Sequence, residues 1–479
     1  MIRKPLLVEF HTDKTVDQLF ASLKELPYSF LLATGQPAGE ERFSFLGADP
    51  YAVIVSKNGL TTVQWRHKPG QTSVAGNPLD VMKNCLARLE PLEVIPEIPF
   101  TGGAVGFFSY DLGRQLEQVP AAAADDLQTP DLCFGLYDVV LVADHLTGQK
   151  IIVSTGHPAA SGAKAAVRAR ARAAWLRELL QYNSGAAGKA TGQPPVNLRA
   201  NFTGQSYRER VRQAVEHILN GDIFQVNLSQ RFELQSAMDS WQLFQDLKSI
   251  SPAPQSAYLK FPAIEVVCSS PERFLQLNHQ RQVITCPIKG TRPRGANEAE
   301  DLQNYLALKH SDKDRAELTM IVDLSRSDLG KVCEIGSVEA EMPYRIETFS
   351  TVHHLVAAVR GQLPGNKGIF DLLKAAFPGG SITGAPKIKA MEIIDRLEPV
   401  RRGIYTGSLG YIGLDGRADL NIVIRTVIKV KGRYYFHVGG GITAKSDAAA
   451  EYYETLDKAK ALLRALRFEG SIYHGPYTD

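Results

Sequence analysis

One lysine has surroundings that suit either a reactive amine or an ordinary surface charge. Lys289 lies in the segment CPIKGTRPRG (residues 286–295), after an apolar stretch and before a run of glycine, proline and arginine. An amine attacks as a nucleophile only when it is neutral, so burial or a nearby positive charge would have to lower its pKa from the reference value of about 10.4. The segment alone leaves both interpretations open.

A carboxyl group is expected close to this amine. In SSPERF (residues 269–274), Glu272 follows a proline and precedes a strand that we expect over RFLQLN (residues 273–278). A short turn later comes a second expected strand, which ends at Lys289. If the two strands pair, Glu272 and Lys289 come into the same neighbourhood.

Further charged residues are spaced along two expected helices. In AAAEYYETLDKAKALLRAL (residues 448–466), Glu451, Glu454 and Lys458 share one helix face. Two carboxylates three residues apart can hold a hard cation such as Mg²⁺, and an ammonium one turn on can meet a substrate carboxylate. A solvated helix with ion pairs explains the same spacing. The second expected helix is HSDKDRAELTMIVDLSRSDLGKV (residues 310–332), which contains Glu317. Taken alone, Glu317 is consistent with a charge at the edge of an apolar stripe.

Two other segments carry groups that could contact a ligand. His354 lies in the apolar stretch VHHLV, where a buried histidine is more often a hydrogen-bonded core residue than a base. The segment PGGSITGAPKIKAMEIIDRLEP (residues 378–399), which includes Thr383, predicts a glycine-rich loop and then an amphipathic helix with Pro386 near its first turn. Amides at such a helix start bind anions. Neither a Walker A ending nor a nicotinamide-type glycine motif is present.

Composition limits the class of protein. The chain has 479 residues, 44% apolar and 22% charged, which is typical of globular proteins and enough for two or three domains or one large one. A formal net charge of +3 gives no general argument for nucleic acid or an anionic membrane, and five scattered cysteines without a C-x-x-C pair argue against a disulfide framework. The apolar stretch near the amino terminus is too short for a signal peptide, and no apolar stretch of the sequence is long enough to span a bilayer. We expect a cytoplasmic protein without a membrane partner.

The elements that must position these residues fall into two portions. Up to about residue 155 the sequence predicts a sheet with few helices, including a hairpin that turns at Asn58-Gly59. An alanine- and arginine-rich helix near residue 170 follows, and then a flexible linker at 183–196. We therefore distinguish an amino-terminal portion, residues 1–196, from a carboxy-terminal portion, residues 197–479.

Helices and strands alternate in the carboxy-terminal portion. An amphipathic helix is expected over Tyr207–Leu219. The clearest hairpin is NIVIRTVIKVKGRYYFHVGGGIT (residues 421–443), which turns at Lys431-Gly432. Arg425 lies in its first expected strand, and Gly440 and Gly441 close its second.

Eight stretches together resemble one family, the chorismate-utilising enzymes. This family includes anthranilate synthase large subunits, aminodeoxychorismate synthase component I, and isochorismate and salicylate synthases. The stretches lie in family order across about residues 100 to 465: FTGGAVG, GDIFQVNLSQRF, SPERF, PIKGTRPRG, FPGGSITGAPKIKAMEIID, YTGSLGYI, NIVIRT and AEYYETLDK. The resemblance implies an α+β fold, a large two-sheet β-sandwich flanked by helices, with both portions in one globule and the active site at its centre.

The resemblance also implies roles for individual residues. The Lys289 amine would attack C2 of chorismate, and Glu272 would act as the general acid for loss of the C4 hydroxyl. Glu317, Glu451 and Glu454 would hold Mg²⁺ against the C1 carboxylate of the substrate. The remaining residues implied in substrate binding are Arg425 on the pyruvyl carboxylate, His354 near the ring, the amides of Gly440 and Gly441, Lys458, Thr383 and Gln225.

Within the family the resemblance is closest to the aminodeoxychorismate synthases, because anthranilate synthases typically carry alanine at the position of Lys289. That branch adds ammonia to chorismate, keeps the enolpyruvyl group, and serves p-aminobenzoate and folate biosynthesis. Gln225 stands where water-adding relatives carry a lysine base, and glutamine cannot deprotonate water. No cysteine lies in a G-x-C-x-G elbow, so ammonia is expected from a separate glutamine amidotransferase subunit, component II, or from free ammonium.

Three alternatives remain at this stage. An anthranilate synthase large subunit would release pyruvate. A non-catalytic chorismate-binding subunit is disfavoured by the complete set of Glu272, Lys289, Glu317 and Glu451, since binding alone needs neither an acid nor a nucleophile. A nucleic-acid module would use the arginines of the helix near residue 170 and would bind with steep salt dependence; they are Arg168, Arg170, Arg172 and Arg177.

Overall fold

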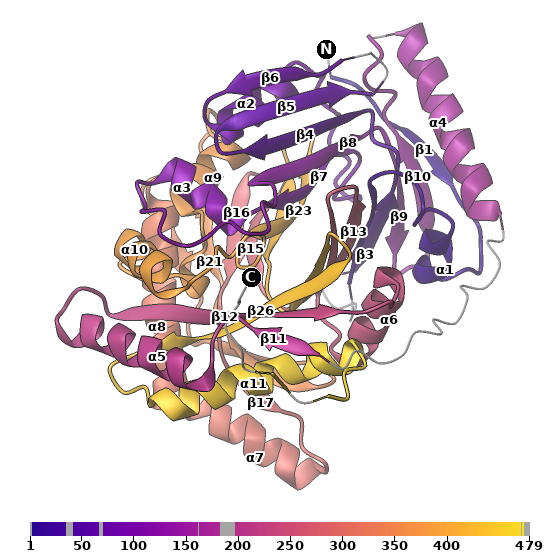
Figure 1. Ribbon diagram of the computed structural model, residues 1–479. Coiled ribbons are helices and arrows are strands. Elements are labelled where there is room, and N and C mark those ends of the chain that lie inside the picture. Colours follow the sequence, from indigo (N-terminus) through magenta and orange to yellow (C-terminus); the bar gives the residue numbers. More distant parts are fainter. Residues whose placement is uncertain are drawn as a thin grey trace.

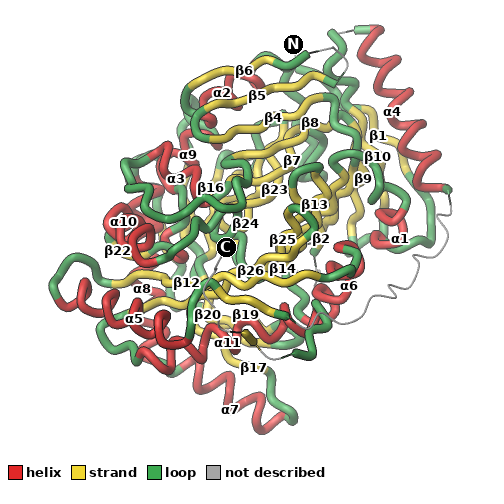
Figure 2. The backbone as a smooth tube through the Cα atoms, in the orientation of Figure 1, coloured by secondary structure: helices red, strands yellow, loops and turns green. Residues whose placement is uncertain are grey.

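Two large, mainly antiparallel sheets face each other, and most helices lie on their outer faces (Figure 1). The same layering is visible in Figure 2, where the strands occupy the middle of the molecule and the helices its periphery. The computed structural model describes residues 2–34, 42–66, 70–160, 162–182, 197–470 and 472–473. The linker expected at residues 183–196 lies outside the described residues.

Each large sheet contains strands from both portions of the chain, with one block of neighbouring strands from each portion. The first sheet contains, in spatial order, β1 (Leu6–Glu9), β10 (Lys150–Ser154), β9 (Val139–Asp144), β3 (Phe43–Gly47), β2 (Ser29–Ala33), β13 (Gln255–Phe261), β14 (Ile264–Ser270), β25 (Thr426–Val430), β26 (Arg433–Ile442), β12 (Gln225–Gln235), β11 (Leu198–Ala200) and β27 (Ile472–Tyr473), with β22 (Gly384–Ala385) paired to β12. The second contains β18 (Glu339–Ala340), β21 (Val359–Gln362), β16 (Gln282–Cys286), β15 (Arg273–Leu277), β24 (Ala418–Ile422), β23 (Ser408–Gly413), β7 (Gly103–Phe108), β8 (Leu132–Tyr137), β4 (Ala52–Lys57), β5 (Leu60–Trp65) and β6 (Thr72–Ala75). Because β2 pairs with β13 and β7 pairs with β23, neither sheet is divided near residue 196.

A third, smaller sheet and the helices complete the described structure. The small sheet contains β17 (Ile288–Pro293), β20 (Val352–Val356) and β19 (Arg345–Thr348). The helices are α1 (Val16–Ala21), α2 (Pro78–Ala87), α3 (Gly113–Leu116), α4 (Ala163–Gln181), α5 (Gly204–Leu219), α6 (Ser240–Ile250), α7 (Glu298–Lys309), α8 (Asp312–Gly330), α9 (Ile369–Ala376), α10 (Lys387–Leu397) and α11 (Ala448–Ala465), with the short turns η1 (Tyr110–Leu112) and η2 (Gly380–Ile382).

The core is layered as the period-two pattern of the strands requires. Along β7, Val105 and Phe107 point into the cluster between the two sheets, whereas Ala104 and Phe108 join the cluster on the outer face of the second sheet. Helices α2, α8 and α9 cover that outer face, and α1, α4, α6 and α11 cover the outer face of the first sheet. The predicted α+β two-sheet sandwich is therefore confirmed.

The hairpins and amphipathic helices expected from the sequence are present. Asn58 and Gly59 have φ of 49° and 77°, and the turn at Lys431 and Gly432 has φ of 48° and 79°, values that fit two-residue hairpin turns. Helix α5 begins earlier than expected, at Gly204, because the Thr203 side chain caps it. The first strand of the second hairpin begins only at Thr426, since residues 421–422 belong to β24.

The strand that carries Lys289 was predicted wrongly. Strand β16 pairs with β15 as expected but ends at Cys286, and Pro287 separates it from a new strand. Lys289 is the second residue of that new strand, β17, which pairs with β20 in the small sheet. Glu272 and Lys289 are therefore not on paired strands, and their approach depends on how the small sheet lies against the larger two.

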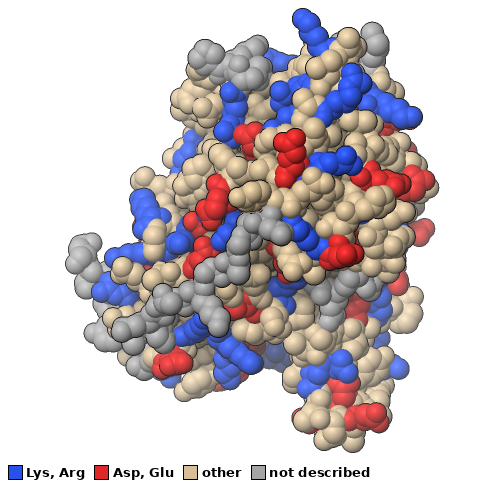
Figure 3. All heavy atoms as spheres, turned by 90° about the vertical axis from the view of Figure 1, so that its right-hand side faces the viewer, with Lys and Arg blue, Asp and Glu red and all other residues tan. Residues whose placement is uncertain are grey.

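The arginine-rich helix α4 uses two of its arginines inside the protein. Arg168 and Arg172 lie 2.9 and 3.1 Å from the fully buried carboxylate of Asp138, and Arg172 also pairs with Asp49. On the face of the molecule that carries α4, acidic side chains lie among the basic ones (Figure 3). Two of the four arginines considered for nucleic-acid binding thus serve to hold α4 on the first sheet.

None of the described helices is long and apolar enough to cross a membrane.

The close approach of three strands explains a glycine in the FTGGAVG segment. A Cβ atom at Gly106 would lie 2.0 Å from the backbone oxygen of Cys133 on β8. We expect Gly106→Ala to lower the free energy of unfolding by about 1–3 kcal/mol, because the strands must separate to admit the methyl group. Thermal unfolding midpoints would show this against Gly365→Ala, where a Cβ meets no atom within 4 Å. Equal midpoints for the two variants would contradict the explanation.

Candidate active site

A cavity of about 450 Å³ lies between the first sheet, the small sheet and the loops that connect the two large sheets. Strands β12 and β26 form one wall, and β17 and β20 form another. Of the residues predicted for the site, seven line this cavity: Glu272, Lys289, His354, Arg425, Gly440, Gly441 and Lys458. A cavity of this size accommodates a small organic molecule.

Two neighbouring chain crossovers carry the acid and the guanidinium. Strand β14 of the first sheet continues into β15 of the second through Glu272, and β24 of the second returns to the first as β25 through Arg425. The crossovers are joined by backbone hydrogen bonds from Ile422 to Glu272, 3.0 Å, and from Ser269 to Arg425, 3.1 Å. The two functional side chains are therefore held by one pair of neighbouring segments, at the point where both change sheets.

Glu272 is set up to hold a proton near neutral pH. Its side chain is buried, with 5% of the residue exposed. Burial raises the pKa of Glu272 to about 7, although a hydrogen bond from Ser381, the charge of Lys289 and the amide of Ile288 oppose the shift. A carboxyl group that titrates near 7 can donate a proton to a leaving group at physiological pH.

Lys289 lies close to Glu272 in the same cavity, since the Glu272 carboxyl group accepts from the amide of the preceding residue, Ile288. Its amine donates a hydrogen bond to the backbone oxygen of Ser381, 3.4 Å away. Burial lowers the pKa of Lys289, while the carboxylates of Glu317 and Glu272 partly offset this effect. A bulge after Lys289, where Gly290 has φ of 76°, breaks the regular pairing of β17 with β20. The amine thus lies near two carboxyl groups, in a site where losing its proton costs less free energy than in water.

Arg425 and His354 form a cationic corner of the cavity. The Nη2 atom of Arg425 lies 3.4 Å from Nε2 of His354, and Nδ1 of His354 lies 2.8 Å from the Thr291 hydroxyl. Burial and the charge of Arg425 lower the pKa of His354 to about 3, so the imidazole is neutral and its Nε2 accepts from the guanidinium. Burial alone lowers the pKa of Arg425 to about 10, and no carboxylate of the described chain offsets it. An anionic ligand would supply the missing countercharge.

The glycines of β26 leave room for the carboxylates of α11. A Cβ atom at Gly440 would lie 3.3 Å from Oε2 of Glu451 and 3.3 Å from Oε1 of Glu454. Glu454 pairs with Lys458 at 2.8 Å, and Glu451 accepts from the Ser446 hydroxyl at 2.6 Å. The two carboxylates therefore converge on one point beside the cavity wall, as the helical spacing predicted.

Electrostatic coupling extends this group to Glu317 on α8. Burial and then the charges of neighbouring carboxylates, Glu454 among them, raise the pKa of Glu317, while Lys289 and Lys313 oppose the rise. Burial raises the pKa of Glu451 as well, and the charge of Glu454 adds to the effect. Within the described ranges, no three His, Cys, Asp or Glu side chains are close enough together to hold a metal ion. Glu454 thus repels both Glu317 and Glu451, and it is itself paired with Lys458.

Two predicted binding residues lie outside the cavity wall. Thr383 is fully buried, and its hydroxyl donates to the backbone oxygen of Gly379 at 2.9 Å. Gln225 is also fully buried and abuts Gly441, and neither atom of its amide group has a hydrogen-bond partner among the described residues. The structure brings Gln225 next to the cavity and gives Thr383 a structural position behind it.

The glycine-rich loop before α10 does not form the open anion site that its sequence suggested. Residues Gly384–Ala385 form β22 and pair with the start of β12. The amine of Lys387, in the first turn of α10, donates hydrogen bonds to the carboxylate of Asp328 and to the backbone oxygen of Ala376. Only the preceding turn reaches the cavity, through Ser381 and Ile382.

Several cavity residues were missed by the sequence reasoning. The loop between α10 and β23 contributes Arg402, Tyr405 and Thr406, and β26 contributes His437. The ring of His437 stacks on Tyr405, with centroids 4.8 Å apart and planes at 9°. Tyr405 begins the YTGSLGYI segment, so the motif marked the place without indicating which of its residues faces the cavity.

One cavity holds a buried acid, an amine with a lowered pKa and a guanidinium that has no carboxylate partner among the described residues, an arrangement typical of an enzyme active site for an anionic substrate. Residues 28–464 match the model of one protein family, described as chorismate binding enzyme. The chain belongs to that family.

Individual relatives match over nearly the whole chain. The sequence is 42% identical to aminodeoxychorismate synthase component 1 of Klebsiella aerogenes, over 93% of this chain and 95% of the relative. It is 38% identical to anthranilate synthase component 1 of Thermus thermophilus, over 97% of both chains. The crystal structure of anthranilate synthase component I from Streptococcus pneumoniae matches the fold with a TM-score of 0.79 at 30% identity, covering 89% of this chain and 93% of that one.

The unpaired guanidinium gives a direct test of ligand binding. We expect Arg425→Gln to weaken chorismate binding about 10- to 100-fold, because a charge-assisted hydrogen bond contributes roughly 1.5–3 kcal/mol. Isothermal titration calorimetry would measure the Kd, with Arg467→Gln as a control that removes the same charge from a surface pair with Asp246. An unchanged Kd in Arg425→Gln would exclude this residue from anion binding.

Proposed function

We propose that this protein converts chorismate and ammonia into 4-amino-4-deoxychorismate, a transfer of an amino group to C4 that leaves the enolpyruvyl group in place. The observation that carries the proposal is the Lys289 amine, which shares one cavity with the protonatable Glu272. A binding protein would need neither group. The 42% identity to a relative named aminodeoxychorismate synthase component 1 supports the same activity.

The two groups would divide one difficult displacement into two steps. The neutral Lys289 amine forms a bond to C2 of chorismate, the ring double bonds shift, and the C4–oxygen bond breaks. Glu272 gives its proton to the departing hydroxyl, which leaves as water. Ammonia then bonds to C4, the double bonds shift back, and the C2–nitrogen bond breaks to free the neutral lysine. The ammonium group formed at C4 loses one proton, which restores the protonated form of Glu272. Chorismate and ammonia are consumed, and aminodeoxychorismate and water are formed.

The cationic and amide groups of the cavity would orient the substrate. Arg425 suits the pyruvyl carboxylate, since its planar fork can bind two oxygens and it has no carboxylate partner in the described chain. His354 is neutral and would contact the ring without adding charge. The backbone of Gly440 and Gly441 and the ammonium of Lys458 would face the second carboxylate.

Mg²⁺ is the cation that this site would hold. The oxygen donors are of the type that hard cations prefer, and the two carboxylates of α11 converge over Gly440, where no side chain fills the space. Glu317, Glu451 and Glu454 would be its ligands after Glu454 releases Lys458. When bound, the ion would neutralise the C1 carboxylate of the substrate and relieve the repulsion among the three glutamates.

Ammonia would come from a second protein. The relatives are named component 1, and we infer that a glutamine amidotransferase subunit supplies this chain with ammonia. Free ammonium salts would replace the subunit in assays with the isolated chain.

Anthranilate synthesis is the second candidate, supported by the Thermus thermophilus relative at 38% identity. That reaction also uses chorismate and ammonia but eliminates pyruvate, and it has no use for an enzyme amine as nucleophile. The position of Lys289 within the cavity therefore favours the first candidate.

The rate should have a bell-shaped dependence on pH. The neutral fraction of Lys289 rises with pH, whereas the protonated fraction of Glu272 falls as pH rises through its pKa of about 7. Since the two groups interact, the two limbs give apparent pKa values of the pair. We expect kcat/KM for chorismate, measured from pH 5.5 to 9.5, to decline on the alkaline side, and Glu272→Gln to lower kcat by about 10²- to 10⁴-fold. A rate that rises steadily to pH 9.5 would remove Glu272 from the role of acid.

Product analysis tests the proposal directly. The purified chain would be incubated with chorismate, Mg²⁺ and an ammonium salt, and the products identified by liquid chromatography and mass spectrometry. We expect aminodeoxychorismate without pyruvate, and a loss of at least about 100-fold in Lys289→Ala. The surface variant Lys374→Ala serves as the control, since it removes an amine from an exposed pair with Asp80. Anthranilate with an equal amount of pyruvate would instead assign the protein to the second candidate.

A further inference from the structure

The loop between α10 and β23 needs support from outside itself. It carries three cavity residues, Arg402, Tyr405 and Thr406. Its backbone takes the left-handed conformation at Gly403, with φ of 58°, and at Thr406, with φ of 59°. Because a threonine rarely adopts this conformation, the surrounding structure must hold the loop in place.

One turn of the amino-terminal portion clamps the peptide groups of Gly403. The Ser109 hydroxyl and the Tyr110 amide donate to the Gly403 oxygen at 2.5 and 2.8 Å. The Gly403 amide in turn donates to Oδ2 of Asp111 at 2.9 Å. Both polar groups of this glycine are thus bound by three consecutive residues that lie nearly 300 positions earlier in the sequence.

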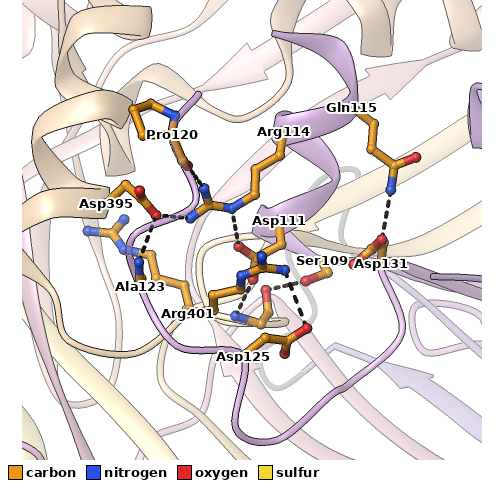
Figure 4. Close-up of polar contacts among 12 residues, drawn as sticks. Ser109, Asp111, Arg114, Gln115, Pro120, Ala123, Asp125, Asp131, Asp395 and Arg401 are labelled. Carbon is orange, nitrogen blue, oxygen red and sulfur yellow. Dashed lines mark hydrogen bonds and ion pairs between the residues drawn. The ribbon is translucent and has the colours of Figure 1, made fainter. Parts of the chain in front are cut away.

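Asp111 is itself fixed by an arginine that also reaches α10. Nε of Arg114 lies 2.9 Å from Oδ1 of Asp111, and the same guanidinium bonds to Asp395 on α10 and to the backbone oxygen of Pro120. Figure 4 shows Arg114 between the two carboxylates, with Asp395 also accepting from the backbone of Ala123. Asp111 and Asp395 are buried, so each needs this partner.

The Ser109–Asp111 turn, which we call the clamp, is in direct contact with residues that line the cavity. Arg402 precedes the clamped glycine, and its guanidinium lies under the ring of Tyr110, 4.8 Å from the centroid. The same guanidinium donates to the backbone oxygens of Ile382 and Asn227, at 2.9 and 2.8 Å, so it links two other parts of the cavity wall. A shift of Gly403 would therefore move Arg402, Tyr405 and Thr406 together.

We propose that Asp111, held in place by Arg114, is a positioning residue for substrate binding: it fixes Gly403 and so sets the cavity wall formed by Arg402, Tyr405 and Thr406. The inference rests on the proposed function in taking this cavity as the chorismate site. Asp111 does not line the cavity, and its effect is transmitted through the Gly403 amide.

A buried aspartate elsewhere in the chain provides a matched control. Asp138 is fully buried and is held by two arginines, Arg168 and Arg172, yet it is no part of the cavity wall. Asp138→Asn and Asp111→Asn each remove one buried charge from an arginine pair. A loss of folded protein alone lowers the apparent kcat and leaves KM unchanged, whereas a displaced cavity wall raises the KM for chorismate.

The experiment measures kcat and KM for chorismate at saturating ammonium in the full chain, together with thermal unfolding. We expect Asp111→Asn to raise the KM about tenfold with kcat within about threefold, and Asp138→Asn to leave the KM unchanged. Arg114→Gln should raise the KM in the same direction, because it removes the guanidinium that fixes the Asp111 carboxylate. Ser109→Ala, which removes only the hydroxyl bond to Gly403, should raise the KM to a smaller extent and keeps the test valid if Asp111→Asn does not fold.

The outcomes separate this inference from the proposed function. If the unaltered chain makes no aminodeoxychorismate, the proposed function fails, and chorismate affinity measured by calorimetry still tests the clamp. If the unaltered chain is active and Asp111→Asn, Arg114→Gln and Ser109→Ala all keep its KM, the positioning role is overturned.

Discussion

The site depends on one constraint, the pair of chain crossovers that tie the two large sheets together. Glu272 lies where β14 becomes β15, and Arg425 lies where β24 becomes β25. At such a point a strand leaves one sheet and its side chains lose the regular alternation, so a polar residue can face the space between the sheets. Hydrogen bonds between the crossovers fix the separation of acid and guanidinium before any ligand binds.

Desolvation shifts the pKa values of the three groups Glu272, Lys289 and Arg425. The same burial raises the pKa of Glu272 and lowers the pKa of Lys289, which favours the neutral form of both. Arg425 stays charged because its pKa, though lowered to about 10, remains far above neutral pH. The cavity thus brings together a protonatable carboxyl group, an amine with a lowered pKa and a charged guanidinium.

Local patterns in the sequence predicted the elements well and their spatial neighbours less well. The hairpin turns, α11 with Glu451 and Glu454 on one face, and the two-sheet class follow from short-range periodicity and turn residues. The strand of Lys289 was misplaced because period-two alternation does not say which sheet a strand joins, and Pro287 was not recognised as the break. The loop with Arg402 and Tyr405 has no periodicity, so only the tertiary structure shows which of its side chains face the cavity.

The amino-terminal portion contributes to the site without supplying any of the predicted catalytic or binding groups. Its turn at Ser109–Asp111 binds Gly403, and its next segment pairs with the same loop, since Ala124 and Val400 form a parallel bridge. A loop with two left-handed residues could not hold this shape through its own contacts. The two stretches on either side of residue 196 therefore form one structural unit: the carboxy-terminal stretch supplies the residues that line the cavity, and the amino-terminal stretch binds the loop that carries three of them.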